Sequence, residues 1–156
     1  MFKVRLSNRE EALEAYEIRE VLEGLASRIA ARVLSDETID DMIARFEAYA
    51  KNSVADFSDD YVRLNFEMHQ MISDCFVNRA ASMLIVTMTM QTRSYGKKYS
   101  HYASFEESVQ DHLDILYALK KRDEDGAENA MRSHIRNIRS VFSAMLDGDS
   151  IAADGV

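Results

Sequence analysis

Three of the four histidines in this chain lie among apolar residues at helical spacing, and imidazole nitrogens are common ligands of transition-metal ions. At about 100° per residue, His69, His112 and His134 each point in the direction of neighbouring apolar side chains, and Asn65 lies one turn before His69 on the same face. The apolar residues on these faces are Val62, Phe66, Ile72 and Phe76 for His69; Phe105, Val109, Leu116 and Leu119 for His112; and Met131, Ile138, Val141 and Met145 for His134. We therefore expect the three imidazoles to point into the core from three separate helices.

Buried imidazoles can be accommodated in two ways. Each ring can form its own hydrogen bonds inside the core, or one metal ion can satisfy all three rings, because an imidazole without a partner is costly to bury. Neutral nitrogen ligands favour a divalent transition metal over calcium, with zinc or nickel first and manganese or iron as alternatives. The spacing of the histidines leaves both possibilities open. The fourth histidine, His101 in "KKYSHY", is expected to be a solvated loop residue.

Several known active-site patterns are absent from the sequence. No histidine has a glutamate three residues before it, which argues against a di-iron site, and there is no His-Glu-x-x-His, Gly-x-Ser-x-Gly or glycine-rich phosphate loop. No residue stands out as a general base beside the histidines. Three histidines with an open coordination position still describe zinc enzymes that activate water, so a metal-dependent hydrolase or hydratase is the alternative to a binding site.

The composition predicts a single soluble domain. A chain of 156 residues with 47% apolar residues fits one core, and no apolar run approaches the roughly 20 residues that a membrane span needs. The start "MFKVRLSNREE" lacks the apolar segment of a signal peptide, so we expect a cytoplasmic protein. The net charge of −8, without a basic cluster, argues against DNA binding by this chain alone. The one cysteine, Cys75, is expected to be a small buried hydrophobe.

The hydrophobic pattern is helical throughout and predicts an all-α antiparallel bundle of about six helices. There is no proline, there are only five glycines, and no segment alternates as a strand does. Short connections favour antiparallel neighbours. The expected helices cover residues 8–34, 36–52, 58–76, 78–96, 104–122 and 124–146. The fourth is apolar nearly all round and is therefore expected to be central, while residues 147–156 are expected to be a disordered tail.

Three stretches resemble a known family: "YEIREVLEGLASRIAARV", "NFEMHQMISDCFVNRAASML" and "ESVQDHLDILYALKKRDEDGAENAMRSHI". They are similar to the FCD domain, the effector-binding C-terminal domain of the FadR subfamily of GntR transcription regulators. The resemblance covers residues 10–146. It includes Arg19 and Glu23 in the first helix, an acid directly before His112, and a pattern in the last helix. That pattern is formed by Asp123, Ala127, Met131 and His134.

The resemblance implies a divalent metal bound by His69, His112, His134 and Asn65, the last standing where relatives carry an aspartate. It also implies a small carboxylate effector at or near the metal. Arg19 could fork onto such a carboxylate, or could instead reach a surface glutamate. Other candidate anchors are Arg93 with Gln91 and Tyr95, and Asn137 one turn after His134.

The function implied by the resemblance is ligand sensing for a transcription regulator rather than catalysis. A small organic acid would bind in the bundle and control DNA binding by a winged-helix domain that is absent from this chain, with residues 1–9 as a remnant of the linker to it. Relatives are commonly homodimers, so a homodimer is expected. No membrane partner is expected. The alternative function remains a three-histidine hydrolase or hydratase.

Overall fold

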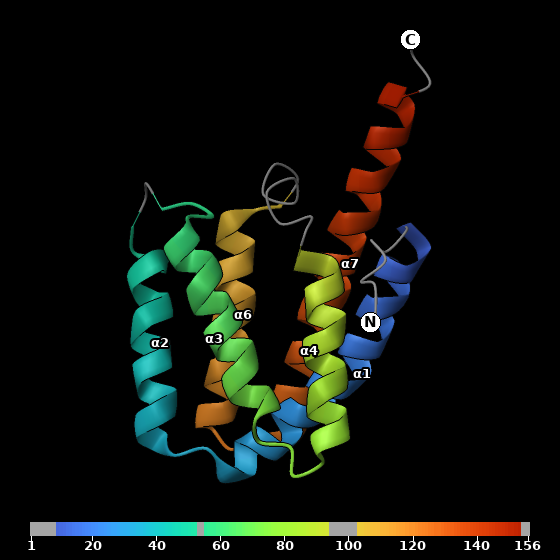
Figure 1. The fold of residues 1–156 in the computed structure, drawn as a ribbon. Coiled ribbons are helices and arrows are strands. Elements are labelled where there is room, and N and C mark those ends of the chain that lie inside the picture. Colours follow the sequence, from blue (N-terminus) through green and yellow to red (C-terminus); the bar gives the residue numbers. More distant parts are fainter. Residues whose placement is uncertain (1–8, 53–54, 94–102, 154–156) are drawn as a thin grey trace.

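The computed structural model describes the chain except for residues 1–8, 53–54, 94–102 and 154–156. Its described part contains six helices and no strand (Figure 1). The helices are α1 (Arg9–Val33), α2 (Asp36–Ala50), α3 (Asp59–Ser73), α4 (Arg79–Arg93), α6 (Phe105–Lys120) and α7 (Glu124–Ala153). The prediction of an all-α bundle of about six helices is confirmed.

Local sequence explains where the helices begin. Ser35, Ser58 and Ser104 precede α2, α3 and α6, and each hydroxyl accepts a hydrogen bond from a main-chain N–H in the first turn. Each of these helices also carries two acidic residues in its first turn, where the helix dipole favours negative charge. Asn78 caps α4 by accepting from the N–H groups of two following residues. Capping therefore fixes where α3 and α6, the helices of His69 and His112, begin.

The long helices α1 and α7 pack side by side in opposite directions (Figure 1). Ion pairs run along their contact, from Arg28 with Glu128 at one end to Glu17 with Arg139 at the other. Gly24 of α1 faces the side chain of Arg132 of α7, since a Cβ atom there would lie 2.8 Å from an Arg132 side-chain carbon. Helices α3, α4 and α6 pack against this pair.

The core lies between α1, α2, α3, α6 and α7. Its largest fully buried side chains are Phe46, Tyr61, Met68, Ile72, Leu116, Leu119, Met131, Ile135, Phe142 and Met145, together with Ile39 and Ile115. In α7, Ala127, Met131 and His134 are buried on one face, and the carboxylate of Asp123 accepts from the N–H of Gly126 as the helix begins. The pattern from Asp123 to His134 in the last helix therefore consists of a cap followed by buried residues of one face.

Helix α4 is not central, and the prediction that it would be is wrong. It packs mainly on α1, with Ile85 and Thr92 turned inward, whereas Met83 is 69% exposed and Met90 is 59% exposed. An all-round apolar sequence predicts burial on every side, but within one chain only one side of this helix has a neighbour. The outer side therefore remains an apolar surface, and the exposed Ile18, Val21 and Leu25 of α1 add to the apolar surface of the chain.

The last helix also differs from expectation. It continues to Ala153 instead of ending near residue 146, and its end projects beyond the other helices in Figure 1. Gly148 does not stop it, because one glycine costs a helix only about 1 kcal/mol and helix-forming residues follow. The remainder of the expected disordered tail, residues 154–156, lies outside the described residues. None of the described helices is long and apolar enough to cross a membrane.

Candidate metal centre and effector site

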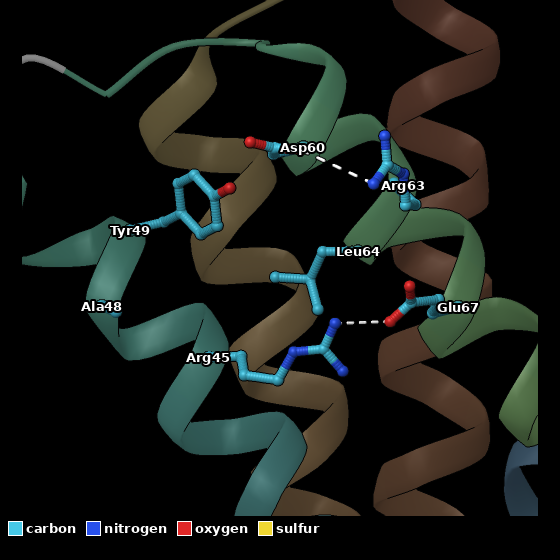
Figure 2. A pocket seen from close by; sticks show the side chains of 7 residues that line it. All are labelled: Arg45, Ala48, Tyr49, Asp60, Arg63, Leu64 and Glu67. Carbon is cyan, nitrogen blue, oxygen red and sulfur yellow. Dashed lines mark hydrogen bonds and ion pairs between the residues drawn. The ribbon is translucent and has the colours of Figure 1, made fainter.

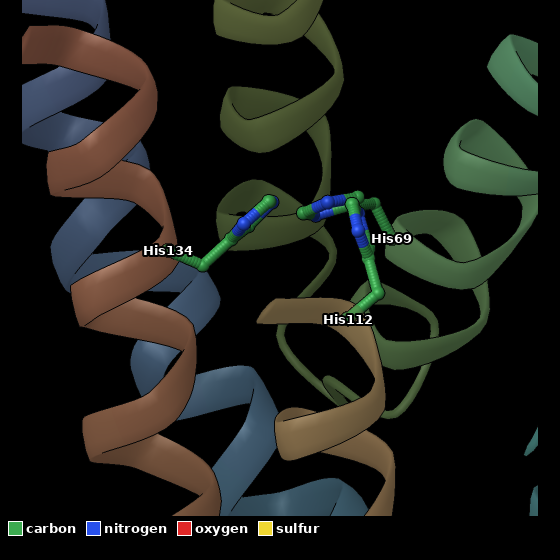
Figure 3. Close-up of side chains that lie close together, drawn as sticks. All are labelled: His69, His112 and His134. Atoms are coloured by element: carbon green, nitrogen blue, oxygen red, sulfur yellow. The ribbon is translucent and has the colours of Figure 1, made fainter. Parts of the chain in front are cut away.

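The three inward histidines converge. His69 from α3, His112 from α6 and His134 from α7 are all buried, and one ring nitrogen of each lies within 4.8 Å of those of the others. Figure 3 shows the rings turned toward one another from their separate helices. The ring centroids are 4.3 Å apart for His112 and His134, 5.3 Å for His69 and His134, and 5.5 Å for His69 and His112. The expectation of three inward imidazoles is confirmed.

Each ring uses its Nδ1 atom for a hydrogen bond within the protein. The acceptors are Glu23 Oε2 for His69 (2.5 Å), the main-chain oxygen of Ser108 for His112 (2.5 Å) and Asp111 Oδ2 for His134 (3.2 Å). When Nδ1 carries the proton, Nε2 carries the lone pair, and metal-binding histidines are commonly held in this way. All three rings can therefore present an Nε2 ligand at the same time.

Within the protein, the Nε2 atoms of His112 and His134 are poorly supplied with hydrogen-bond donors. That of His134 is buried and has no hydrogen-bond partner in the described structure. That of His112 faces the amide oxygen of Asn65 at 2.9 Å. Two acceptors at this distance repel each other, so either the amide turns its N–H inward or a cation is shared by both atoms. A transition-metal ion fits this set of donors, with Asn65, His69, His112 and His134 as the residues that would hold it.

The surroundings of two of the three rings, His112 and His134, favour their neutral form. Burial lowers the pKa of His112 well below its ordinary value, and the neighbouring His134 and His69 lower it further. Burial also lowers the pKa of His134, although its hydrogen bond to Asp111 opposes the shift. Neutral imidazole is the form that binds metal, so at neutral pH these two rings need not lose a proton to do so.

The candidate anchor Arg19 is buried rather than paired with a surface glutamate. Its Nε donates to Glu23 Oε1 (2.7 Å), its Nη1 donates to Thr92 Oγ1 of α4 (3.4 Å), and its guanidinium lies 5.3 Å from the ring centre of Tyr16. Glu23 joins Arg19 to His69, so the arginine belongs to the surroundings of the histidine cluster. Two partners already engage Arg19, and a carboxylate would have to share or replace them.

Asn137 lies at the open side of the cluster. It is exposed, and its amide donates to Asp111 Oδ2 (3.1 Å), the same oxygen that accepts from His134. An open pocket of about 390 Å³ between α6 and α7 is lined by these three residues. The other lining residues are Ala103, Ser104, Glu107, Ser108, Ile138, Ser140 and Val141. The pocket gives solvent or a small ligand a polar approach to the His134 side of the cluster.

The remaining candidate residues are not brought to the cluster by any contact described. Gln91 is half-buried on α4, the side chain of Arg93 at the end of that helix is not described, and Tyr95 and His101 lie outside the described residues. On α3, the face shared by Asn65 and His69 is only partly inward, because Val62 and Phe66 are exposed. The roles of Gln91, Arg93 and Tyr95 as effector anchors stay predictions.

Sequence reasoning noted two acids, Glu23 and Asp111, as parts of the family pattern but missed their role as hydrogen-bond partners of the histidines. Glu23 and Asp111 each accept from an imidazole, although no partner had been identified from the chain. Asp111 had a local signal, since it directly precedes His112 and is near His134 only in the folded chain. Glu23 lies one turn after Arg19 on the buried face of α1, and an acid at such a position signals a buried partner.

A second pocket lies between α2 and α3, away from the histidines (Figure 2). It is lined by Arg45, Ala48, Tyr49, Asp60, Arg63, Leu64 and Glu67. Each of its two arginines is paired with a carboxylate, Arg45 with Glu67 and Arg63 with Asp60. Its charges therefore neutralise one another, and we assign no ligand to it.

Comparison with known protein families identifies the family of this domain. The family model of the FCD domain matches residues 14–137, which is most of the chain and includes every histidine of the cluster. The chain therefore belongs to the FCD family, the effector-binding domains of GntR-type transcription regulators. Among curated proteins, no sequence matches this chain.

Proposed function

We propose that this domain senses a small carboxylate metabolite through a divalent transition metal held by His69, His112, His134 and Asn65. The observation that carries the proposal is the convergence of three buried imidazoles whose Nδ1 atoms are all engaged, which leaves their Nε2 atoms for one ion. Zinc or nickel suits these nitrogen ligands first, with manganese or iron as alternatives. The hydrogen-bonded alternative leaves His134 Nε2 without a partner.

An organic acid is the effector that this centre would favour. Three neutral imidazoles and a neutral amide leave the full +2 charge of the ion in a poorly solvated site, which attracts an anion strongly. The pocket beside His134 and Asn137 supplies a route. Arg19 lies near His69 and would bind the anion by sharing or replacing its present partners Glu23 and Thr92. Gln91, Arg93 and Tyr95 remain candidates for the far end of the ligand.

The effector signal would be read by DNA-binding modules carried outside this chain. In this proposal, two copies of the domain associate, and effector binding changes the relation between the winged-helix domains attached to them. The exposed apolar residues of α4 and α1, including Met83, Met90, Ile18 and Val21, support a homodimer because such side chains favour burial against a partner. The cytoplasm is the compartment that suits this role. Sedimentation of the wild type against Val21→Glu tests the association, and an unchanged sedimentation coefficient would contradict this interface.

The alternative of a metal-dependent hydrolase is weaker. Burial alone would raise the pKa of Glu23, but the positive Arg19 and the hydrogen bond with His69 lower it to about 2. Burial likewise opposes a low pKa for Asp111, yet its hydrogen bonds with His134 and Asn137 lower the pKa. A general base works best with a pKa near the working pH, so neither carboxylate beside the cluster suits the role.

A thermal-shift screen of small organic acids, with and without chelator, tests the proposal. We expect acids to raise the melting temperature when zinc is present and to lose this effect in chelator, because ion and anion raise each other's affinity. Equal shifts in both arms would contradict metal-anchored binding and would leave Arg19 or Arg93 as the anchor. Uncharged amides of the active acids are the matched control and should give no shift.

A further inference from the structure

One carboxylate contacts both a proposed metal ligand and a proposed effector anchor. Glu23 Oε1 accepts from Arg19 Nε at 2.7 Å, and Glu23 Oε2 accepts from His69 Nδ1 at 2.5 Å. The side chain of Glu23 is 1% exposed, so water does not supply a substitute for either partner. Glu23 is on α1 and His69 is on α3, and Arg19 continues the chain of contacts to Thr92 on α4. This carboxylate therefore ties together the elements on one side of the metal centre.

The ion pair between Glu23 and Arg19 determines where the proton of His69 lies. The guanidinium of Arg19 can only donate, so the carboxylate beside it is held as an acceptor on both of its oxygens. The proton shared with His69 must then be on Nδ1, which leaves the Nε2 lone pair for a metal. The opposite tautomer would place two acceptors against each other in a buried site and would put a proton on Nε2.

We propose that Glu23 is a positioning residue of the metal centre, which holds His69 in the Nδ1–H form and orients Arg19 beside it; this inference rests on the proposed function. Carboxylates that accept from metal-binding histidines fix the ring and raise its basicity, and their loss typically weakens metal binding about 10- to 100-fold. Here the same carboxylate also neutralises the arginine. Metal affinity and the state of the effector anchor are therefore set by one side chain.

Glutamine, the uncharged isostere introduced by Glu23→Gln, cannot accept hydrogen bonds from both Arg19 and His69. Glutamine offers one acceptor oxygen and one donor amide, whereas Arg19 and His69 each present a donor. If the introduced amide N–H faced His69, Nδ1 would become the acceptor and the proton would move to Nε2, where it blocks metal binding. If that N–H faced Arg19 instead, two donors would meet in a buried site. Removing Arg19 as well frees the amide oxygen of the introduced glutamine to accept from His69.

The experiment reads the tautomer of His69 directly. Protein with ¹⁵N-labelled histidine is studied without metal at pH 8 by two-bond ¹H–¹⁵N correlation, with the His69 signals assigned through His69→Gln. The variants are Glu23→Gln, the double variant Arg19→Met/Glu23→Gln, and Glu20→Gln as a matched control. Glu20 is on the same helix and pairs with Arg136 of α7, so its substitution removes the same charge away from the histidines. Calorimetric titration with zinc is performed on each folded protein.

We expect the Nδ1–H tautomer in the wild type and in Glu20→Gln, and a shift toward Nε2–H in Glu23→Gln. Zinc affinity should fall about 10- to 100-fold in Glu23→Gln and change less than about twofold in the control. The double variant should regain the Nδ1–H form, and it keeps the test available if Glu23→Gln does not fold. An Nε2–H tautomer in the wild type, or an unchanged tautomer and zinc affinity in Glu23→Gln, would overturn the inference. A wild type that binds no zinc would instead contradict the metal-dependent function, and the tautomers of the metal-free proteins would still decide the role of Glu23.

Discussion

The two carboxylates beside the histidines occupy different surroundings. Glu23 is fully buried, lies on α1 and is shared between Arg19 and His69, whereas Asp111 is partly exposed at the edge of an open pocket. Both accept a hydrogen bond from an imidazole. In the described part of the structure, solvent reaches the Asp111 side through the pocket, whereas Glu23 is buried. The Asp111 side can therefore exchange ligand, while the Glu23 side must be assembled during folding. The comparison separates the closed part of the proposed metal site from the open part through which an effector would enter.

The largest expected difference is in the stability of the metal-free domain. Glu23→Ala leaves Arg19 buried without its carboxylate, and breaking a buried ion pair in this way costs about 3 to 5 kcal/mol of the free energy of unfolding. Asp111→Ala removes a partly exposed hydrogen bond and should cost about 1 kcal/mol. Urea unfolding in chelator measures both values. The double variant Arg19→Met/Glu23→Leu should recover much of the loss, and equal costs for Glu23→Ala and Asp111→Ala would remove the distinction between the two sides.

The second prediction concerns stabilisation by metal. A ligand at 100 times its dissociation constant stabilises the folded state by about 2.7 kcal/mol, and His112→Ala should abolish this gain because the ring is central to the cluster. The melting temperature of His112→Ala should therefore be the same with zinc and with chelator. The wild type, measured alongside, should melt higher in zinc. A zinc-dependent rise as large in His112→Ala as in the wild type would show that the metal binds elsewhere.

The third prediction concerns Asn65, which contacts His112 between the two sides. Asn65→Asp adds a negative ligand, so zinc should bind on the order of tenfold more tightly, equivalent to about 1.4 kcal/mol. The negative charge of the aspartate should also weaken metal-dependent binding of an organic acid, because the ion and its ligands would then carry +1 instead of +2. Calorimetry with zinc and then with an acid found in the thermal-shift screen measures both. If neither affinity changed, Asn65 would not face the ion, and the site would be a polar pocket that binds through hydrogen bonds.

The smallest expected effect is at Asn137, on the open side. Asn137→Ala removes an exposed amide that donates to Asp111, so stability should change by less than about 0.5 kcal/mol. Zinc affinity should stay within about twofold, since such a surface group has little effect on the buried ligands. Affinity for the organic acid should fall measurably if the pocket is its route. A fall in zinc affinity without a fall in acid affinity would reverse the roles assigned to the two sides.

The sequence predicted what is local and missed what depends on packing between distant segments. The helical period placed the rings of His112 and His134 inward, since burial of a face follows from its own neighbours. At His69 the ring is buried as expected, although Val62 and Phe66 of the same predicted face are exposed. The contact between Glu23 and His69 joins residues 46 positions apart, and no spacing along the chain reveals it. The same holds for Asp111, whose neighbour in sequence is His112 but whose hydrogen-bond partner is His134.

Helix α4 shows a second limit of periodicity. Its apolar residues were assigned to the core because hydrophobic side chains favour burial, but a sequence does not say whether that burial occurs within the chain or against another copy. Met83 and Met90 are exposed here, while Thr92, a polar residue, is buried against Arg19. The hydrogen bond explains the exception, because a buried hydroxyl is tolerated where it has a partner.

X-ray absorption spectroscopy at the zinc edge, on protein loaded with one equivalent of zinc, tests the central claim most directly. Imidazole ligands produce a characteristic outer-shell scattering, so the number of bound histidines can be counted. The account predicts about three imidazoles per zinc in the wild type and about two in His112→Ala if any zinc is retained there. A wild-type spectrum with one imidazole or none, or a spectrum that His112→Ala leaves unchanged, would contradict a metal held by His69, His112 and His134.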